Sequence, residues 1–234
     1  MGLGRLADEV FAAVIFDLDG TLIDSTPAVL RSWAIWASEY GVGPMDQHRQ
    51  HGIPSASVVR AVMPEHLHET AIQRISELEI ADLDDIVVLP GAVEALSSLA
   101  GAKNAIATSC TVPLADARIA AAQLAPPSVL VTADDVVRGK PHPEPFLEAA
   151  RRLGVDPRRC LVVEDAPKGL EAARAAGCFT LALVTTTARE LLDADAVVAD
   201  LSEVRFDADH EGIRVSLVDA TAGALRQAQR ATTS

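Results

Sequence analysis

The sequence predicts an α/β fold, in which a doubly wound parallel sheet carries a small all-helical domain inserted after its first strand. Three observations support this prediction. Short apolar, β-branched runs recur along the chain, alanine-rich amphipathic segments lie between them, and one long stretch shows a helical pattern without a convincing strand. Strands that alternate with helices form right-handed βαβ crossovers, and successive crossovers build a doubly wound sheet.

The expected strands are short apolar runs, which are typical of strands that a parallel sheet buries on both faces. These runs occupy residues 13–16, 105–107, 129–131, 161–163 and 180–184. Helices are expected between them, several with proline near the start and glycine just past the end, at residues 92–99, 113–123, 144–153 and 168–176. Residues 204–218 predict a hairpin or an extra edge strand.

Residues 25–87 interrupt the alternation of strands and helices. Only helical pattern occurs there, separated by glycine and proline, at residues 28–40, 55–63 and 66–78. We therefore expect an α/β core formed by residues 1–24 and 88–234, and a helical domain formed by residues 25–87. Trp33 and Trp36 stand at helical spacing, so we expect them to pack inside the helical domain or against the core.

Composition excludes several classes of protein. The 234 residues are 49% apolar, which is enough to bury a core, and 33 acidic residues against 20 basic ones give a net charge of −13. This charge argues against nucleic-acid and membrane partners. Three widely spaced cysteines, Cys110, Cys160 and Cys178, predict neither a disulfide framework nor a structural zinc site. No apolar run approaches the length of a membrane helix, and a cytoplasmic location is expected.

Polar side chains follow the expected strands at the points where those strands end. They are Asp17-Leu18-Asp19-Gly20-Thr21 after the first strand, Thr108-Ser109 after the second, Gly139-Lys140-Pro141 beyond the third, and Glu164-Asp165 after the fourth. Ligands of open α/β sheets bind at the carboxyl ends of the strands. We therefore expect these carboxylates, hydroxyls and the one lysine to converge on a single site.

The residue types in this set favour phosphoryl chemistry. Clustered carboxylates repel one another unless a cation joins them, and hard oxygen ligands favour Mg²⁺. Hydroxyls and an ammonium group suit the oxygens of a phosphoryl group. Asp17 and Asp19 are separated by one residue on an extended strand end, so their side chains point to the same side and one can attack while the other handles a proton. The pattern predicts an enzyme that forms an aspartyl phosphate.

The four groups, in this order, resemble the four motifs of the haloacid dehalogenase superfamily. The resemblance covers most of the chain, and such an ordered set is far more specific than any one motif. The residues in and around these motifs are similar to those of the sugar- and polyol-phosphate phosphatases, namely the 2-deoxyglucose-6-phosphate, glycerol-phosphate and hexitol-phosphate phosphatase group. This closer similarity lies in residues 107–109, 139–145 and 163–167 and in His51-Gly52.

The resemblance implies a role for each aspartate and for the metal. Asp17 would attack phosphorus, while Asp19 would protonate the leaving alcohol and then deprotonate the hydrolytic water. Mg²⁺ would be held by the Asp17 carboxylate, the Asp19 backbone carbonyl and Asp165. Glu164 would either ligate the metal or act through hydrogen bonds to its surroundings, and the residues alone do not decide between these roles.

The resemblance also implies how substrate is bound. Thr108 and Lys140 would neutralise the equatorial phosphoryl oxygens, helped by backbone N–H groups that include that of Ser109. The helical domain would be a cap that closes over the substrate. His51 in this cap would either contact the substrate or bond to backbone groups of its own loop.

Other residues near the motifs have plainer interpretations. Thr21 is expected to hydrogen-bond locally. Asp24 is either the N-cap of the first cap helix or a catalytic group. Cys110 has no obvious histidine partner, so a nucleophilic role is not expected. Lys168 would sense a second charge on the substrate or face water.

The function predicted is that of a Mg²⁺-dependent phosphatase of small sugar or polyol phosphate monoesters. A phosphosugar mutase of the β-phosphoglucomutase type is the alternative, but such enzymes carry a histidine where Val29 stands and an arginine where Ser55 falls. Asp19 argues against a haloacid dehalogenase proper, which needs no such proton transfer. A phospho-accepting regulatory module is a further alternative, although its acceptor would lie on a later strand. The expected partner is a small phosphate ester, and the chain is expected to be a monomer or a weak homodimer.

Overall fold

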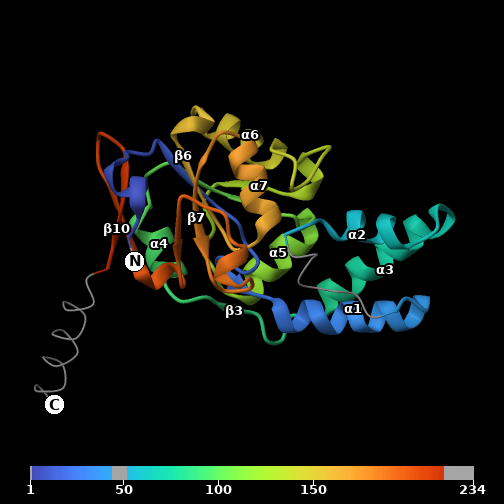
Figure 1. Cartoon of the computed structure of the whole chain (residues 1–234). Helices are drawn as coiled ribbons and strands as arrows, with labels where there is room; N and C mark the ends of the chain where they lie inside the picture. Colours follow the sequence, from blue (N-terminus) through green and yellow to red (C-terminus); the bar gives the residue numbers. More distant parts are fainter. Residues whose placement is uncertain (1, 44–51, 219–234) are drawn as a thin grey trace, which may run out of the picture.

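A computed structural model describes residues 2–43 and 52–218 of the chain. At its centre is a six-stranded parallel sheet, in the order β5-β4-β1-β6-β7-β8 (Figure 1). The strands are β1 (Ala13–Phe16), β4 (Asn104–Ala107), β5 (Val129–Val131), β6 (Cys160–Glu164), β7 (Phe179–Leu183) and β8 (Ala196–Val198). The predicted fold class is confirmed. The edge strand β8 was not expected.

The order of the strands decides where a ligand can bind. From β1 the chain moves outward through β4 to β5, then returns to the other side of β1 with β6 and continues outward to β8. Connections therefore leave β1 and β6 toward opposite edges, which opens a crevice at the carboxyl ends of these strands. Asp17 sits at this point, and its backbone N–H donates to the carbonyl of Val163 at 2.9 Å.

Helices cover both faces of the sheet. Helices α6 (Glu144–Leu153) and α7 (Pro167–Ala175) cover one face. The other face is covered by α4 (Ala92–Ser98), α5 (Val112–Ala121) and the antiparallel hairpin of β9 (Val204–Ala208) and β10 (Ile213–Leu217). Successive residues of β1 alternate between the two apolar layers, with Ile15 in one and Phe16 in the other. The Phe16 ring meets that of Phe206 of the hairpin edge-on at 5.9 Å, and residues 204–218 thus adopt the hairpin that was one of the two expectations.

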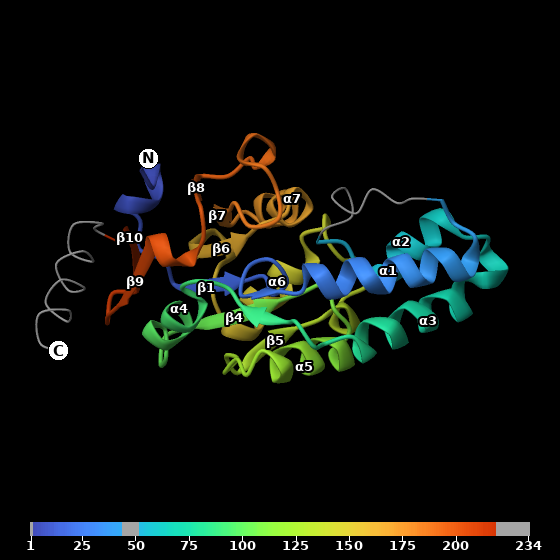
Figure 2. The same cartoon turned by 90° about the horizontal axis from the view of Figure 1, so that it is seen from below.

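Three further helices lie beyond the sheet and form the helical insert: α1 (Thr26–Tyr40), α2 (Ser55–Val62) and α3 (His68–Ala81) (Figure 2). They enclose an apolar cluster of their own that contains Trp33 and Trp36. The Trp36 indole N–H donates to the backbone carbonyl of Ala71 at 2.9 Å, which ties α1 to α3. Both tryptophans pack inside this group of helices, which is one of the two places where they were expected.

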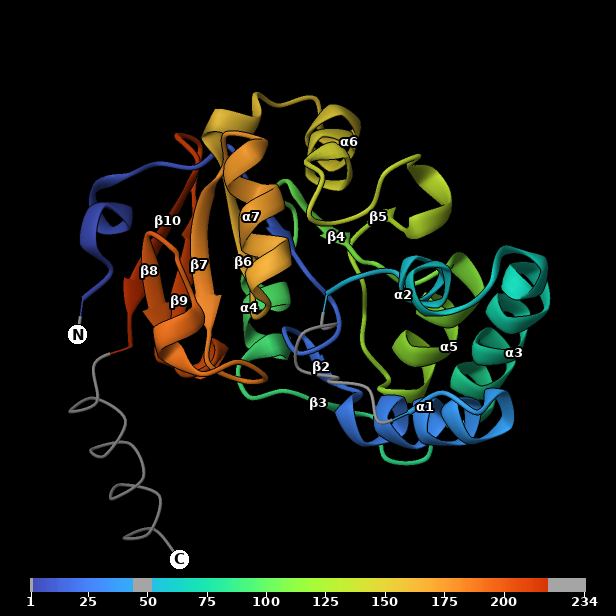
Figure 3. The same ribbon diagram turned by 45° about the vertical axis from the view of Figure 1, so that its right-hand side comes forward.

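A short antiparallel ribbon joins the insert to the sheet. It consists of β2 (Ile23–Asp24) and β3 (Val87–Val88), which pair where the chain leaves for α1 and where it returns from α3 (Figure 3). The predicted domain boundaries coincide with this ribbon. That residues 25–87 form a separate domain stays a prediction. Single 3₁₀ turns complete the described elements at Gly4–Asp8, Glu65–Leu67, Ala133–Asp135, Pro157–Arg159, Arg189–Leu191 and Leu201–Glu203. Within the described part of the chain, every helix is too short or too polar to cross a membrane.

Candidate active site

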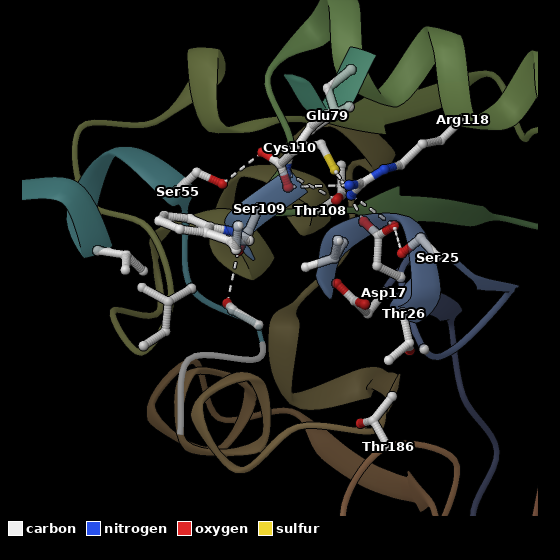
Figure 4. Close-up of a pocket in the computed structure, with 18 residues that line it drawn as sticks. Asp17, Ser25, Thr26, Ser55, Glu79, Thr108, Ser109, Cys110, Arg118 and Thr186 are labelled. Carbon is white, nitrogen blue, oxygen red and sulfur yellow. Dashed lines mark hydrogen bonds and ion pairs between the residues drawn. The ribbon is translucent and has the colours of Figure 1, made fainter. Parts of the chain in front are cut away.

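A pocket lies between the carboxyl ends of the central strands and the helical insert (Figure 4). Its cavity volume is about 80 Å³. Asp17, Asp19 and Thr108 line it from the sheet, whereas Trp33 and Glu79 line it from the insert. Side chains from both parts of the molecule would therefore surround a ligand in this pocket.

Lys140 joins two carboxylates at the phosphate side of the site. Its ammonium group donates to Asp17 Oδ1, and to Glu164 Oε1 at 2.7 Å. The Lys140 and Glu164 side chains are completely buried and that of Asp17 is 5% exposed. Since Asp17 follows β1 and Glu164 ends β6, the lysine connects the two central strands. The structure brings together the residues predicted at these strand ends.

Burial shifts the pKa values of these groups because it penalises charge. Desolvation raises the pKa of Asp17 to about 7, although the attraction of Lys140 opposes this rise. Desolvation also lowers the pKa of Lys140, but the carboxylates of Asp17 and Glu164 outweigh it and leave the net shift upward. One ammonium group thus balances the surrounding carboxylates only in part.

Asp17, Glu164 and Asp165 form a cluster of buried carboxylates whose oxygens lie within 4.8 Å of one another. Desolvation, followed by repulsion from Glu164, raises the pKa of Asp165 well above its usual value. Asp165 accepts hydrogen bonds from the hydroxyls of Thr21, at 3.1 Å, and Thr186. Such an all-oxygen donor set with surplus negative charge fits a hard divalent cation such as Mg²⁺.

The hydrogen bonds of Thr21 correct one expectation. Its hydroxyl was expected to bond locally, but it donates to Asp165, which follows the neighbouring strand β6. The turn after β1 brings the two residues together, and at Gly20 (φ +87°) an added Cβ would overlap the Asp165 carboxylate. Asp165 is far from Thr21 in the sequence, so a local sequence pattern could not predict this hydrogen bond.

Glu164 differs from its neighbours because protein groups already occupy its oxygens. Oε1 accepts from Lys140, and Oε2 accepts the backbone N–H groups of Asp165 at 2.9 Å and Ala166 at 2.8 Å. Gly169 packs against this carboxylate so closely that a Cβ there would overlap it. The carboxylate of Glu164 is thus held in one orientation from several sides.

Asp19 faces the other side of the pocket. Its Oδ1 accepts from the Ser25 hydroxyl at 2.6 Å and from Arg118 Nη1 at 2.9 Å, and its Oδ2 lies 3.0 Å from the thiol of Cys110. Burial and the nearby charge of Asp19 raise the pKa of the Cys110 thiol well above its usual value. The thiol therefore stays protonated, in keeping with the expectation that Cys110 is no nucleophile.

Arg118 of α5 and Glu79 of α3 are site residues that the sequence analysis missed. Each side chain is 4% exposed, and Arg118 Nη2 lies 3.2 Å from Glu79 Oε1. Desolvation raises the pKa of Glu79, and the attraction of Arg118 opposes this rise. A signal was present, because both charges stand in register with apolar residues of their own helices: Glu79 follows Ala71 and Ile75 at intervals of four, and a charge on a buried helix face needs a partner.

Thr108 and Ser109 follow β4 and behave differently. The Thr108 backbone N–H donates to the Val131 carbonyl at 2.9 Å, and its hydroxyl oxygen accepts from the backbone N–H of Cys110 at 3.1 Å. The Ser109 hydroxyl instead donates to the backbone carbonyl of Gly52 at 2.8 Å, which ties the sheet to the helical insert. Both residues line the pocket.

The remaining candidates lie as follows. Asp24 is not the N-cap of α1, because Ser25 holds that position; its carboxylate accepts the backbone N–H of Thr26 at 2.9 Å in a turn just before the helix. Lys168 is 44% exposed and pairs with Glu171 at 3.0 Å, so it faces water. His51 lies outside the described residues.

Comparisons with known proteins agree with this geometry. The family model of haloacid dehalogenase-like hydrolases matches residues 11–177. Hexitol phosphatase A of Escherichia coli (strain K12) is 40% identical over 197 residues, which cover 81% of this chain and 91% of that protein. Glycerol-1-phosphate phosphohydrolase 2 of Saccharomyces cerevisiae is 32% identical over 219 residues, covering 87% and 84%. Among solved structures, a hydrolase from Pseudomonas syringae has a TM-score of 0.76 at 28% identity, covering 82% and 94%.

Proposed function

Because the chain belongs to the haloacid dehalogenase-like hydrolase family, we propose that it is a Mg²⁺-dependent phosphatase that hydrolyses small sugar or polyol phosphate monoesters through an aspartyl-phosphate intermediate. The enzyme is a hydrolase of phosphate monoesters, as its phosphatase relatives are. One observation carries the finer proposal: the completely buried Lys140 joins Asp17 to Glu164 beside Asp165. Such a group stabilises the negative charge that develops on phosphoryl oxygens.

In this proposal Asp17 is the nucleophile. One of its carboxylate oxygens attacks phosphorus, and the bond between phosphorus and the ester oxygen breaks. Asp19 gives a proton to the departing alcohol, and then takes a proton from the water that attacks the aspartyl phosphate. The second step releases inorganic phosphate and restores Asp17. Lys140 and Thr108 stabilise the equatorial oxygens in both steps.

The metal site follows from the same residues. The carboxylates of Asp17 and Asp165 and the backbone carbonyl of Asp19 would hold Mg²⁺. When bound, the ion supplies positive charge that reduces the repulsion between the Asp17 carboxylate and an anionic substrate. We assign Glu164 to the positioning of Lys140 rather than to the metal, because Lys140 and two backbone N–H groups already bond to its oxygens.

The helical insert would act as the cap over this site. It contributes pocket-lining side chains, and the Ser109–Gly52 hydrogen bond connects it to the strand end that carries Thr108. A pocket covered in this way keeps bulk water from the aspartyl phosphate until the alcohol has left.

Two positions in the pocket favour the phosphatase over the mutase alternative. Val29 and Ser55 line the pocket, at the positions where the resemblance places a histidine and an arginine in the mutases. Valine cannot transfer a proton to or from a sugar hydroxyl, and the Ser55 hydroxyl already donates to Glu79 at 2.9 Å. Neither residue supplies the acid, base or cation that a mutase would need here.

The test is release of inorganic phosphate from a panel of glycerol, hexitol and 2-deoxyglucose phosphates, with and without Mg²⁺. Turnover that requires Mg²⁺ is expected for the wild-type enzyme. Asp17→Asn should lower kcat by at least about 10³-fold, because the amide is a poor nucleophile. Asp24→Asn is the matched control, since the side-chain oxygen of asparagine can also accept the backbone N–H of Thr26. Full activity of Asp17→Asn would exclude the nucleophile assignment.

A further inference from the structure

We propose that Glu79, held by Arg118 and Ser55, is a specificity-determining residue that restricts the enzyme to phosphate esters whose alcohol part carries no negative charge. This inference rests on the proposed phosphatase function and adds a residue-level account of which esters the pocket accepts. It concerns the side of the pocket that faces the helical insert, away from Lys140.

The position of Glu79 is the first argument. Its side chain projects from α3 and lines the same pocket as Asp17 and Asp19 (Figure 4). With 4% of the side chain exposed, the carboxylate is removed from bulk water. Its two oxygens accept hydrogen bonds from Ser55 at 2.9 Å and from Arg118 at 3.2 Å. A group held from two elements in this way is fixed before substrate arrives, as a selectivity filter requires.

The balance of charge is the second argument. Among the described residues that line the pocket, Arg118 is the only cationic side chain, and it is already paired with Asp19 at 2.9 Å and Glu79 at 3.2 Å. The one guanidinium on this side is already paired with carboxylates of the protein, so no unpaired cation is left there for a second anionic group of the substrate. A second phosphate or a carboxylate on the substrate would be repelled there, and little solvent is present to screen the repulsion.

Unused hydrogen-bonding capacity is the third argument. A substrate hydroxyl can donate to an oxygen of Glu79, whereas an ionised carboxylate has no proton to donate. The polyol hydroxyls of a neutral ester therefore suit Glu79, and the apolar side chains of Val29 and Trp33 line the same pocket.

The test compares two esters of nearly equal size, glycerol 3-phosphate and 3-phosphoglycerate, which differ in a terminal hydroxymethyl against a carboxylate. We expect the wild-type kcat/KM to favour glycerol 3-phosphate by at least about tenfold. Glu79→Gln keeps the shape and the oxygen acceptor but removes the charge, so this preference should fall by about tenfold. Glu77→Gln is the matched control, because Glu77 lies on the same helix with its side chain 53% exposed, and its preference should stay unchanged.

Two results would overturn the inference: equal kcat/KM of the wild-type enzyme for both esters, or a Glu79→Gln variant that loses activity toward both esters by the same factor, as a purely structural residue would. If Glu79→Gln does not fold, Glu79→Asp keeps the charge and must keep the preference; its loss would contradict the inference. Failure of the proposed function has a different signature, namely no phosphate released by the wild-type enzyme from any ester.

Discussion

The two ends of the pocket are built from different parts of the molecule. At the phosphate end, Asp17 and Glu164 come from adjacent central strands, and Lys140 from the segment between β5 and α6 buries its charge between them. At the other end, Glu79 and Ser55 come from the helical insert, and only Arg118 belongs to the sheet side. In the proposed function the chemistry depends on the sheet and selectivity on the helical insert, and Arg118 connects the two because it bonds both Asp19 and Glu79.

Each end places one buried cation between two carboxylates, but the cations are not equivalent. Lys140 is a compact charge that can turn its donors toward a phosphoryl group, whereas Arg118 presents a planar fork with fixed directions. The lysine suits a phosphoryl group, whose charge changes during the reaction. The arginine suits the part of the pocket that must keep a fixed shape. The predictions below test this division, starting with the largest effect.

Lys140→Met should have the largest effect. It leaves the buried carboxylates of Asp17 and Glu164 without their counter-charge, which should cost about 3–5 kcal/mol in the free energy of unfolding. It should also lower kcat by about 10²- to 10³-fold. Urea denaturation and steady-state kinetics measure the two changes. Lys168→Met, which removes an exposed lysine, should change stability by no more than about 0.5 kcal/mol; an equal effect of both variants would contradict the assignment.

Removal of Mg²⁺ should have an intermediate effect that depends on pH. In the metal-free protein burial raises the pKa of Asp17 from 3.8 to about 7, so the folded state holds a proton that the unfolded chain has lost. Stability of the metal-free protein should therefore fall as the pH rises between about 4 and 7. Since metal binding requires deprotonated carboxylates, the gain in Tm on adding Mg²⁺ should increase over the same range.

At saturating Mg²⁺ this gain should reach roughly 5–10 °C, corresponding to about 2.7 kcal/mol at a hundred times the Kd. Thermal unfolding with Mg²⁺ or with EDTA at several pH values measures it. Asp165→Asn is the control, since loss of one carboxylate ligand should remove most of the gain. A Tm that is the same with Mg²⁺ and with EDTA at every pH would argue against the metal site.

Ser55→Ala should have the smallest effect. This effect should concern the end of the pocket that Glu79, Ser55 and Arg118 form. It removes one hydrogen bond to Glu79, a loss of about 1 kcal/mol, so kcat/KM for a neutral ester should fall about fivefold. Because this hydrogen bond also stabilises the folded protein, Tm should fall by roughly 2–4 °C. Ser57→Ala, two residues along the same helix and exposed, should leave kcat/KM unchanged. A loss for Ser55→Ala as large as that for Lys140→Met would contradict the proposed division of roles.

The fold class follows from the sequence alone, and so does the prediction of which residues meet at the phosphate end of the site. Parallel strands end at one edge of their sheet, so residues that follow strands far apart in the chain must converge there. Asp17, Thr108, Lys140 and Asp165 were identified for this reason. His51 lies outside the described residues, and the boundaries of the helical insert stay a prediction.

The other end of the pocket depends on tertiary packing. The helical register of Glu79 and Arg118 signals buried charges but does not identify their partners, and the two residues meet because α3 packs against α5. The hydrogen bond from Thr21 to Asp165 likewise depends on how the turn after β1 lies against the end of β6, which is far away in the sequence. The physical reason is the same in both cases: strand ends share a common edge that the strand pattern already predicts, whereas the contacts between helices depend on the packing of side chains from the whole molecule.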